Sequence, residues 1–110
     1  MSRAWTPDAG DVVWVHLDPQ VGREQAGHRP AVVLTPASYN RVTQLCVVCA
    51  LTNQVKGYPF EVALPGGGVV LADQVRTISW KARGARLKEK APAEAVADVR
   101  ARLKALLSIP

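Results

Sequence analysis

"QLCVVCALT", residues 44–52, decides the fold because almost every position in it is apolar. A short apolar run of this kind is typical of a strand that is covered on both faces and therefore lies inside a sheet. Cys46 and Cys49 are three positions apart, and residues three apart on a strand point to opposite faces. The CxxC spacing consequently predicts two buried structural thiols, not a metal or redox site, because no second Cys/His pair follows it.

Further strands are expected on both sides of this central run. β-branched and aromatic residues predict them at residues 12–17, 30–35, 60–64 and 69–80, the last as one long bent strand or two. Residues 36–43 are expected to form one helical turn. The glycine-rich residues 65–68 indicate a hairpin turn, since they lack the Lys-Ser/Thr and the following helix of a phosphate-binding loop. We expect the first four strands to form an antiparallel meander.

The end of the chain changes to helical periodicity. Pro92 suits a first helical position, and Glu94 suits a first turn. Apolar residues then recur at steps of three and four, at Val96, Val99, Leu103 and Leu106. The sequence therefore predicts a mainly β, SH3-like barrel of about five strands with a C-terminal α-helix, forming a single domain over residues 1–110.

The composition excludes several classes of protein. The longest uninterrupted apolar run, residues 45–51, is far too short to span a membrane. The N-terminus has no apolar signal-peptide core, so the expected location is the cytoplasm. The net charge is +5, and residues 74–110 carry nine Lys/Arg against three Asp/Glu. This basic excess favours phosphate-bearing partners, although a solubilising face accounts for it equally well.

One face of the first strand is unusually apolar for a surface. In residues 12–17 the odd-numbered positions are expected to face the core, which leaves Val12, Trp14 and His16 on the opposite face. This arrangement suggests a contact between subunits of a homodimer, with His16 as a packed or interface histidine.

Ionisable groups are concentrated at one predicted end of the sheet. Arg29 precedes the strand at residues 30–35, and Thr52 closes the run at residues 44–52. In a meander the start of the second strand and the end of the third lie at the same sheet end, so Arg29 and Thr52 should be close together. The neighbouring loops add Asp18, Glu24, His28 and Lys56.

Such a cluster suits phosphodiester cleavage in RNA. Arg29 could hold the phosphate through a bidentate fork, and Thr52 could donate a hydrogen bond to a non-bridging oxygen. Glu24 or His28 could transfer protons. The sequence shows no cluster of metal ligands, so we expect a metal-independent reaction that uses no cofactor and leaves a 2′,3′-cyclic phosphate and a 5′-hydroxyl. Two structural alternatives to these catalytic roles stay open: Arg29 as an ion-pair partner within the loop, and Thr52 as an ordinary hydroxyl at a strand end.

The chain resembles the MazF/PemK/Kid family of bacterial toxin endoribonucleases, and is most similar to its MazF branch. The resemblance is nearly end to end and rests on "GDVVWVHLDP", "GREQAGHRPAVVL", "TNQVKGYPFEV" and "LADQVRTISWKARGA". It implies a homodimeric barrel of the CcdB/Kid type that cleaves single-stranded RNA, often mRNA, at short motifs. It places the family's catalytic arginine and threonine on Arg29 and Thr52, and an associated glutamate on Glu24. The "LPGGGVV" turn is shorter than in some relatives, which would alter the rim of the site.

The resemblance also implies partners. A cognate MazE-like antitoxin would cover the RNA groove with an acidic, flexible C-terminal segment, and DNA would be contacted only indirectly, through the antitoxin complex. Asp18, His28, Lys56 and Tyr58 are our candidates for RNA contacts, with Tyr58 stacking on a base.

Two other functions compete with the nuclease. A non-enzymatic toxin of the same fold, similar to the CcdB-type gyrase poisons, would bind a protein target through its C-terminal helix. An inert RNA-binding barrel would bind RNA without cutting it. The combination of Arg29, Thr52 and Glu24 favours the nuclease, because a gyrase binder has no need of it.

Overall fold

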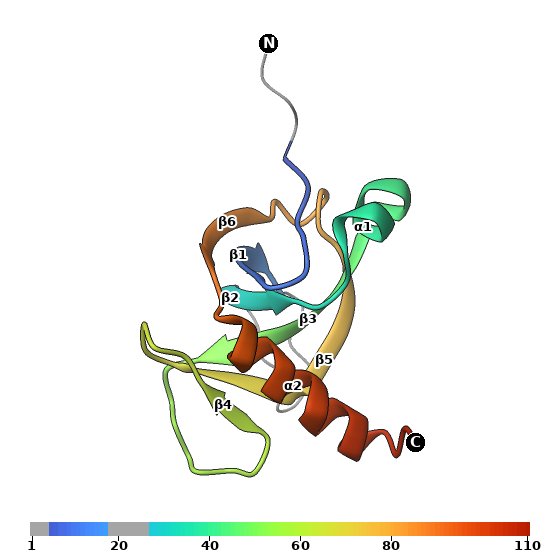
Figure 1. The fold of residues 1–110 in the computed structure, drawn as a ribbon. Helices are drawn as coiled ribbons and strands as arrows, with labels where there is room; N and C mark the ends of the chain where they lie inside the picture. The colour runs from blue at the N-terminus through green and yellow to red at the C-terminus, as the bar shows by residue number, and fades with distance from the viewer. Residues whose placement is uncertain (1–4, 18–26) are drawn as a thin grey trace.

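The computed structural model describes residues 5–17 and 27–110. Its strands are β1 (Asp11–His16), β2 (His28–Val33), β3 (Leu45–Thr52), β4 (Glu61–Ala63), β5 (Val69–Ser79) and β6 (Arg86–Lys90). Its helices are α1 (Ala37–Thr43) and α2 (Ala93–Leu106). The result is a six-stranded, curled antiparallel sheet with a C-terminal helix lying across it (Figure 1), which confirms the predicted fold class.

The order of the strands confirms part of the predicted meander and corrects the rest. The sheet runs β4-β5-β3-β2-β1-β6, so β1, β2 and β3 are sequential neighbours and β3 lies inside the sheet, as its apolar sequence predicts. The meander does not continue to β4, because β5 pairs with β3 and β4 pairs with the other edge of β5. The glycine-rich turn explains this: it folds the three-residue β4 back on β5, with the Leu64 N–H donating to the Gly68 carbonyl at 3.2 Å.

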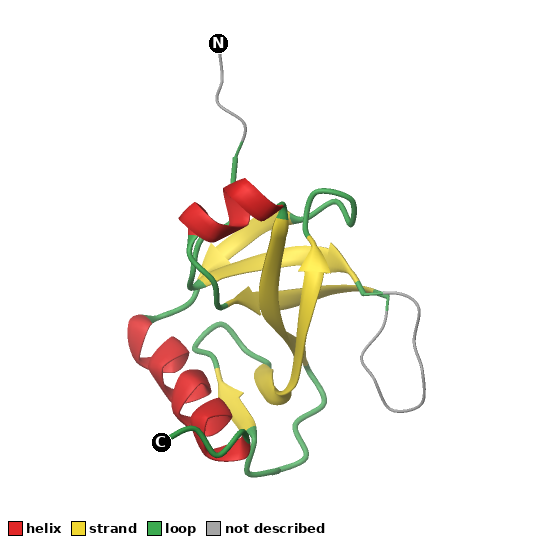
Figure 2. Ribbon diagram, turned by 90° about the vertical axis from the view of Figure 1, so that its right-hand side faces the viewer, coloured by secondary structure: helices red, strands yellow, loops and turns green. Residues whose placement is uncertain are grey.

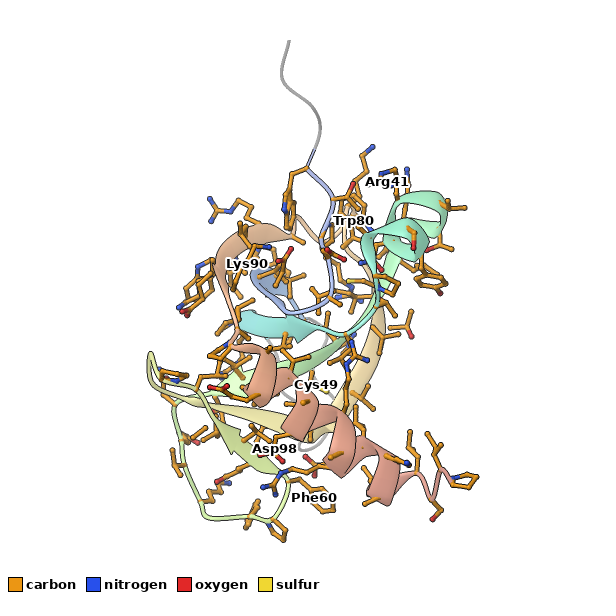
Figure 3. All side chains as sticks on the ribbon, viewed as in Figure 1. Arg41, Cys49, Phe60, Trp80, Lys90 and Asp98 are labelled. Carbon is orange, nitrogen blue, oxygen red and sulfur yellow. The ribbon has the colours of Figure 1, made fainter. Side chains whose placement is uncertain are left out.

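Two apolar clusters lie on the two faces of the central strands. One contains Val12, Cys49 and the buried side of α2, with Phe60 packed against it (Figure 3). The other contains Cys46 and Trp80. The two thiols are therefore separated by the sheet and buried without a disulfide, as the strand geometry predicts. Val12 corrects one expectation, since it is fully buried in the cluster that includes α2 and is not free for a subunit contact.

The buried thiols lead to a first prediction. Burial raises the pKa of Cys46 and of Cys49 from 9.0 to about 12, with the Asp73 carboxylate adding to the rise at Cys49. We expect neither thiol of the folded protein to react with a maleimide at about pH 8, because the thiolate is the reactive form, and both to react in denaturant.

The same shift makes stability depend on pH in a known direction. Between pH 9.0 and about 12 the unfolded thiols lose their protons before the folded ones do. The free energy of unfolding should therefore fall as the pH rises through this interval. Urea titrations of the wild type and of a Cys46→Ala/Cys49→Ala variant test this, and an equal alkaline slope in both would contradict it.

Helix and strand ends differ from the sequence predictions in small ways. β2 begins at His28 and ends at Val33, so it is displaced by two residues from the predicted 30–35. α1 has seven residues instead of one turn, and Gln44 ends it in the left-handed region at φ 59°, which is why β3 begins at Leu45. Residues 69–79 form one strand, with an irregularity in its pairing to β3 opposite Cys49–Leu51.

Helix α2 buries a narrower stripe than the periodicity predicts. Ala95, Val99 and Leu103 are buried, whereas Leu106 is exposed at the end of the helix. Figure 2 shows α2 at the opposite end of the sheet from α1. No helix among the described residues is long and apolar enough to cross a bilayer.

Strand β6 has no counterpart in the sequence prediction. All five of its residues, "RLKEK", are exposed, so it lacks the alternation by which a half-buried strand is found. It is an edge strand that pairs only with β1, and charged residues are a common way to protect such an edge.

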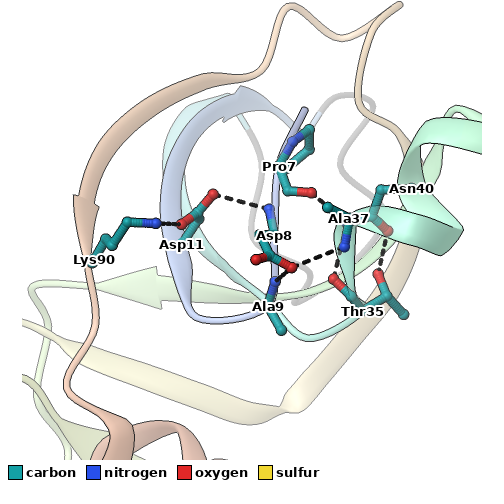
Figure 4. Close-up of polar contacts among 8 residues, drawn as sticks. All are labelled: Pro7, Asp8, Ala9, Asp11, Thr35, Ala37, Asn40 and Lys90. Carbon is teal, nitrogen blue, oxygen red and sulfur yellow. Dashed lines mark hydrogen bonds and ion pairs between the residues drawn. The ribbon is translucent and has the colours of Figure 1, made fainter. Parts of the chain in front are cut away.

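The N-terminal segment is tied to α1 and β6 by a compact polar network (Figure 4). The Asp8 carboxylate accepts hydrogen bonds from the Ala37 and Ala9 N–H groups at 2.8 and 2.9 Å, and these bonds lower its pKa. Lys90 donates to the buried Asp11 carboxylate at 2.7 Å, which raises the pKa of the Lys90 ammonium. Asn40 is fully buried at the α1 side of this network.

Candidate active site

A cleft of about 580 Å³ opens where β2 begins and β3 ends. Its lining comes from β1, β2, β3, the glycine turn and β6: Trp14, Gly27, His28, Arg29, Pro30, Leu51, Thr52, Asn53, Gly66, Gly67, Lys88 and Glu89. The cleft therefore contains Arg29, Thr52 and His28, three of the residues selected from the sequence.

Strand register brings Arg29 and Thr52 together. β2 and β3 pair antiparallel as far as Ala31 opposite Ala50, and two residues further along each strand lie Arg29 and Thr52, which both line the cleft. Both residues lie two positions beyond that pair and thus point to the same face of the sheet. Arg29 also pairs with Val15 of β1, which fixes its backbone from the other side. The guanidinium and the hydroxyl are consequently carried by the ends of two strands inside the sheet.

Thr52 is held closely by its surroundings. It is 8% exposed, and its Oγ1 accepts a hydrogen bond from the Gln54 N–H at 3.2 Å. The backbone of Gly68 passes close by, at φ +79°: a Cβ there would lie 3.2 Å from the Thr52 carbonyl oxygen and 3.1 Å from Asn53 Oδ1. Glycine is therefore required at position 68 for β5 to approach the end of β3.

His28 is the middle ring of an aromatic stack that the sequence analysis did not anticipate. Its ring centroid lies 5.5 Å from that of Trp14 and 4.6 Å from that of His16, with interplanar angles of 30° in both pairs. The Lys88 ammonium lies 5.7 Å from the Trp14 ring. His16, expected as a packed or interface residue, is exposed at the end of this stack.

The opposite rim of the cleft comes from segments that sequence reasoning did not assign to it. Lys88 and Glu89 form an ion pair at 2.7 Å, and a Cβ on Gly66 would lie 3.5 Å from the Glu89 carboxylate. The Gly66–Gly67 turn thus lies against β6 at the rim. The antiparallel pairing of β6 with β1 places Lys88 and Glu89 at this rim. The sequence of β6 does not indicate that pairing.

Lys56 and Tyr58 do not line the cleft that contains Arg29. They line a second cavity, of about 220 Å³, together with Gln54, Glu61, Leu71, Asp73 and Gln74. Thr52 lines both cavities. Lys56 therefore lines a neighbouring cavity that shares Thr52 with the cleft, and its contact with RNA stays a prediction.

Two of the predicted site residues, Asp18 and Glu24, lie outside the described residues. Within residues 5–17 and 27–110, no three His, Cys, Asp or Glu side chains are grouped so as to hold a metal ion.

Comparison with known proteins agrees with this geometry. The family model described as "PemK-like, MazF-like toxin of type II toxin-antitoxin system" matches residues 8–107. The endoribonuclease toxin MazF of Escherichia coli K12 is 49% identical over 110 residues, which cover 97% of this chain and 99% of the relative.

Solved structures show the same likeness. The crystal structure of MazF from Deinococcus radiodurans superposes with a TM-score of 0.93 at 49% identity, covering 96% of this chain and 100% of that one. A MazE–MazF complex from the same organism gives a TM-score of 0.88 at 49% identity, covering 97% and 100%. This chain therefore belongs to the PemK-like, MazF-like family of type II toxin–antitoxin toxins.

Proposed function

We propose that this protein is an endoribonuclease toxin that cleaves single-stranded RNA, including mRNA, at short sequence motifs without a metal ion. The observation that carries the proposal is that Arg29 and Thr52, from the adjacent ends of β2 and β3, line one open cleft. The relatives named as endoribonucleases support the same activity.

The two residues suit an internal transesterification. The 2′-oxygen attacks phosphorus while the P–O5′ bond breaks, giving a 2′,3′-cyclic phosphate and a 5′-hydroxyl. The proton of the 2′-hydroxyl leaves to a base, and the 5′-oxygen gains one from an acid. Arg29 stabilises the charge that builds on the non-bridging oxygens, and Thr52 donates a hydrogen bond to one of them. Glu24 and His28 are the candidates for proton transfer.

The surroundings of the cleft suit a single strand better than a duplex. The His28 stack offers ring surface beside the phosphate site, and unpaired bases bind proteins by stacking. Lys88 on one side and Lys56 on the other supply positive charge for flanking phosphates. Asp18, in the segment before His28, remains a candidate RNA contact.

The proposal includes partners. The Deinococcus radiodurans relative forms a MazE–MazF complex, which supports a MazE-like antitoxin for this chain. DNA would be reached only through such a complex. We also propose a homodimer in the cytoplasm; Val42, 84% exposed, is among the large apolar residues that a second copy could cover.

The CcdB-like alternative is not favoured. The family match is to the PemK and MazF toxins over residues 8–107, and a toxin that only binds a protein target has no need of an arginine and a threonine in one cleft. An RNA-binding barrel without activity is separated from a nuclease by a cleavage assay.

Thr52→Val tests the proposal directly. The substitution keeps the shape of the side chain and removes the hydroxyl, so we expect cleavage to slow about a hundredfold. A 5′-labelled single-stranded RNA is incubated with each protein in EDTA, and products are checked for cyclic phosphate and 5′-hydroxyl ends. Thr52→Ser keeps the donor and should retain most of the rate. Retardation of RNA without cutting by the wild type would support the inert barrel instead.

A further inference from the structure

The loop between β3 and β4, residues 53–60, forms the outer wall of the second cavity. Almost all of it is exposed, and none of it is in a helix or strand (the loop below β3 in Figure 1). It carries Lys56 and Tyr58, whose side chains line the cavity. An exposed loop of this kind keeps a defined shape only if contacts from ordered elements hold it.

Glu61, the first residue of β4, provides those contacts. Its Oε2 accepts a hydrogen bond from the Lys56 N–H and its Oε1 one from the Gly57 N–H, both at 2.9 Å. The Glu61 N–H in turn donates to the Tyr58 carbonyl at 3.1 Å. Gly57 has a positive φ of 80°, a conformation that glycine adopts readily. One carboxylate therefore closes the loop back on the start of its own strand.

A second contact fixes the other end of the loop. Arg102 of α2 donates to the Pro59 carbonyl and pairs with Asp98 at 3.1 Å. Helix α2 holds Pro59, and the Thr52 hydroxyl holds Gln54. The Glu61 carboxylate therefore fixes the part of the loop between Gln54 and Pro59.

The presence of a carboxylate here needs an explanation. Glu61 lines a cavity proposed to receive RNA, and a negative charge there opposes the binding of phosphates. Each of its two oxygens accepts a backbone N–H from the loop, so the carboxylate is a structural acceptor rather than a ligand for the substrate. A pair of successive backbone N–H groups is a typical partner for such an anion.

We propose that Glu61 is a positioning residue that shapes a subsite for one unpaired nucleobase beside the scissile phosphate. The cavity shares Thr52 with the cleft, so a base next to a phosphate at Thr52 would enter it. The Tyr58 ring, 56% exposed, is the surface for stacking, and the Lys56 ammonium lies 5.8 Å from the ring centroid. At about 220 Å³ the cavity is smaller than the sites that bind drug-sized ligands, which suits one base. This inference rests on the proposed nuclease function.

Glu61→Gln distinguishes a positioning role from a simple charge effect, because the two would change KM in opposite directions. Loss of a negative charge alone would tighten RNA binding and lower KM. Loss of an acceptor for the loop N–H groups should instead raise KM for single-stranded RNA about tenfold. The value of kcat should stay within about twofold, since Arg29 and Thr52 are carried by β2 and β3 and not by the loop.

The matched control is Glu94→Gln, which removes the same charge in the exposed first turn of α2 and should not raise KM. Amide hydrogen exchange, measured without RNA, should become faster at Lys56 and Gly57 in Glu61→Gln and stay unchanged in Glu94→Gln.

The outcomes distinguish this inference from the proposed function. A wild type that never cuts RNA overturns the function. A wild type that cuts, with an unchanged or lower KM in Glu61→Gln, overturns the positioning role alone. A parallel fall in kcat and in melting temperature would show a general structural role and would also overturn it.

Discussion

Replacing Arg29 by alanine is expected to slow RNA cleavage by about a thousandfold while leaving the fold intact. The guanidinium belongs to a β2 residue that lines the same cleft as Thr52. It is half-buried at the wall of the cleft, where its charge is screened less than on an open surface. Single-turnover rates on a labelled RNA, with circular dichroism of each variant, measure the effect.

Arg29→Lys is the matched control. Lysine keeps the positive charge but lacks the planar fork that grips two phosphate oxygens, so it should restore only a small part of the rate. A Lys variant as active as the wild type would show that charge alone is needed. An Ala variant that cuts at the wild-type rate, with an unchanged dichroism spectrum, would remove Arg29 from the mechanism.

The sequence predicts part of this site because it identifies one strand, β3, clearly. The apolar run that becomes β3 has a clear signal, because both of its faces are buried, and the polar ends of β2 and β3 follow from antiparallel pairing. The opposite placement of Cys46 and Cys49 follows from the same alternation. Local pattern is therefore enough to bring Arg29 and Thr52 to one end of the sheet.

The far wall of the cleft could not be predicted in the same way. β6 is exposed at every position, so its charges indicate only a solvated face, although Lys88 lies over Trp14. The place of β4 beyond β5 depends on a long-range pairing that no periodicity encodes. For this reason the sequence does not reveal that Lys56 lines a second cavity beside the main cleft.

We expect the largest loss of stability from a substitution at Asn40. Its side chain is completely buried in α1 and makes three hydrogen bonds: Nδ2 donates to the Pro7 carbonyl at 2.7 Å and to the Thr35 carbonyl at 2.9 Å, and Oδ1 accepts from the Thr35 hydroxyl at 2.7 Å. The substitution Asn40→Leu would remove the donor to the Pro7 and Thr35 carbonyls, at a cost of about 1–3 kcal/mol for each, whereas Thr35 Oγ1 would still accept from the Val47 N–H at 3.0 Å.

We therefore expect Asn40→Leu to lower the free energy of unfolding by about 4 kcal/mol, a large part of the total for a domain of this size. Urea denaturation followed by tryptophan fluorescence measures it, because the Trp80 indole donates to the Asn40 carbonyl at 2.9 Å. Ser38→Ala, exposed on the same helix, should change stability by less than about 0.5 kcal/mol.

The same variant should also release the N-terminal segment, because Asn40 holds Pro7 from α1 while Asp8 bonds to Ala37. Limited proteolysis near residues 5–10 should then be faster in Asn40→Leu than in Ser38→Ala. The proposed catalytic pair, Arg29 and Thr52, is at the other end of β3 from α1, so the folded fraction should still cut RNA at the wild-type rate. A loss of stability below about 1 kcal/mol would mean that water or a shifted side chain satisfies the partners of Asn40.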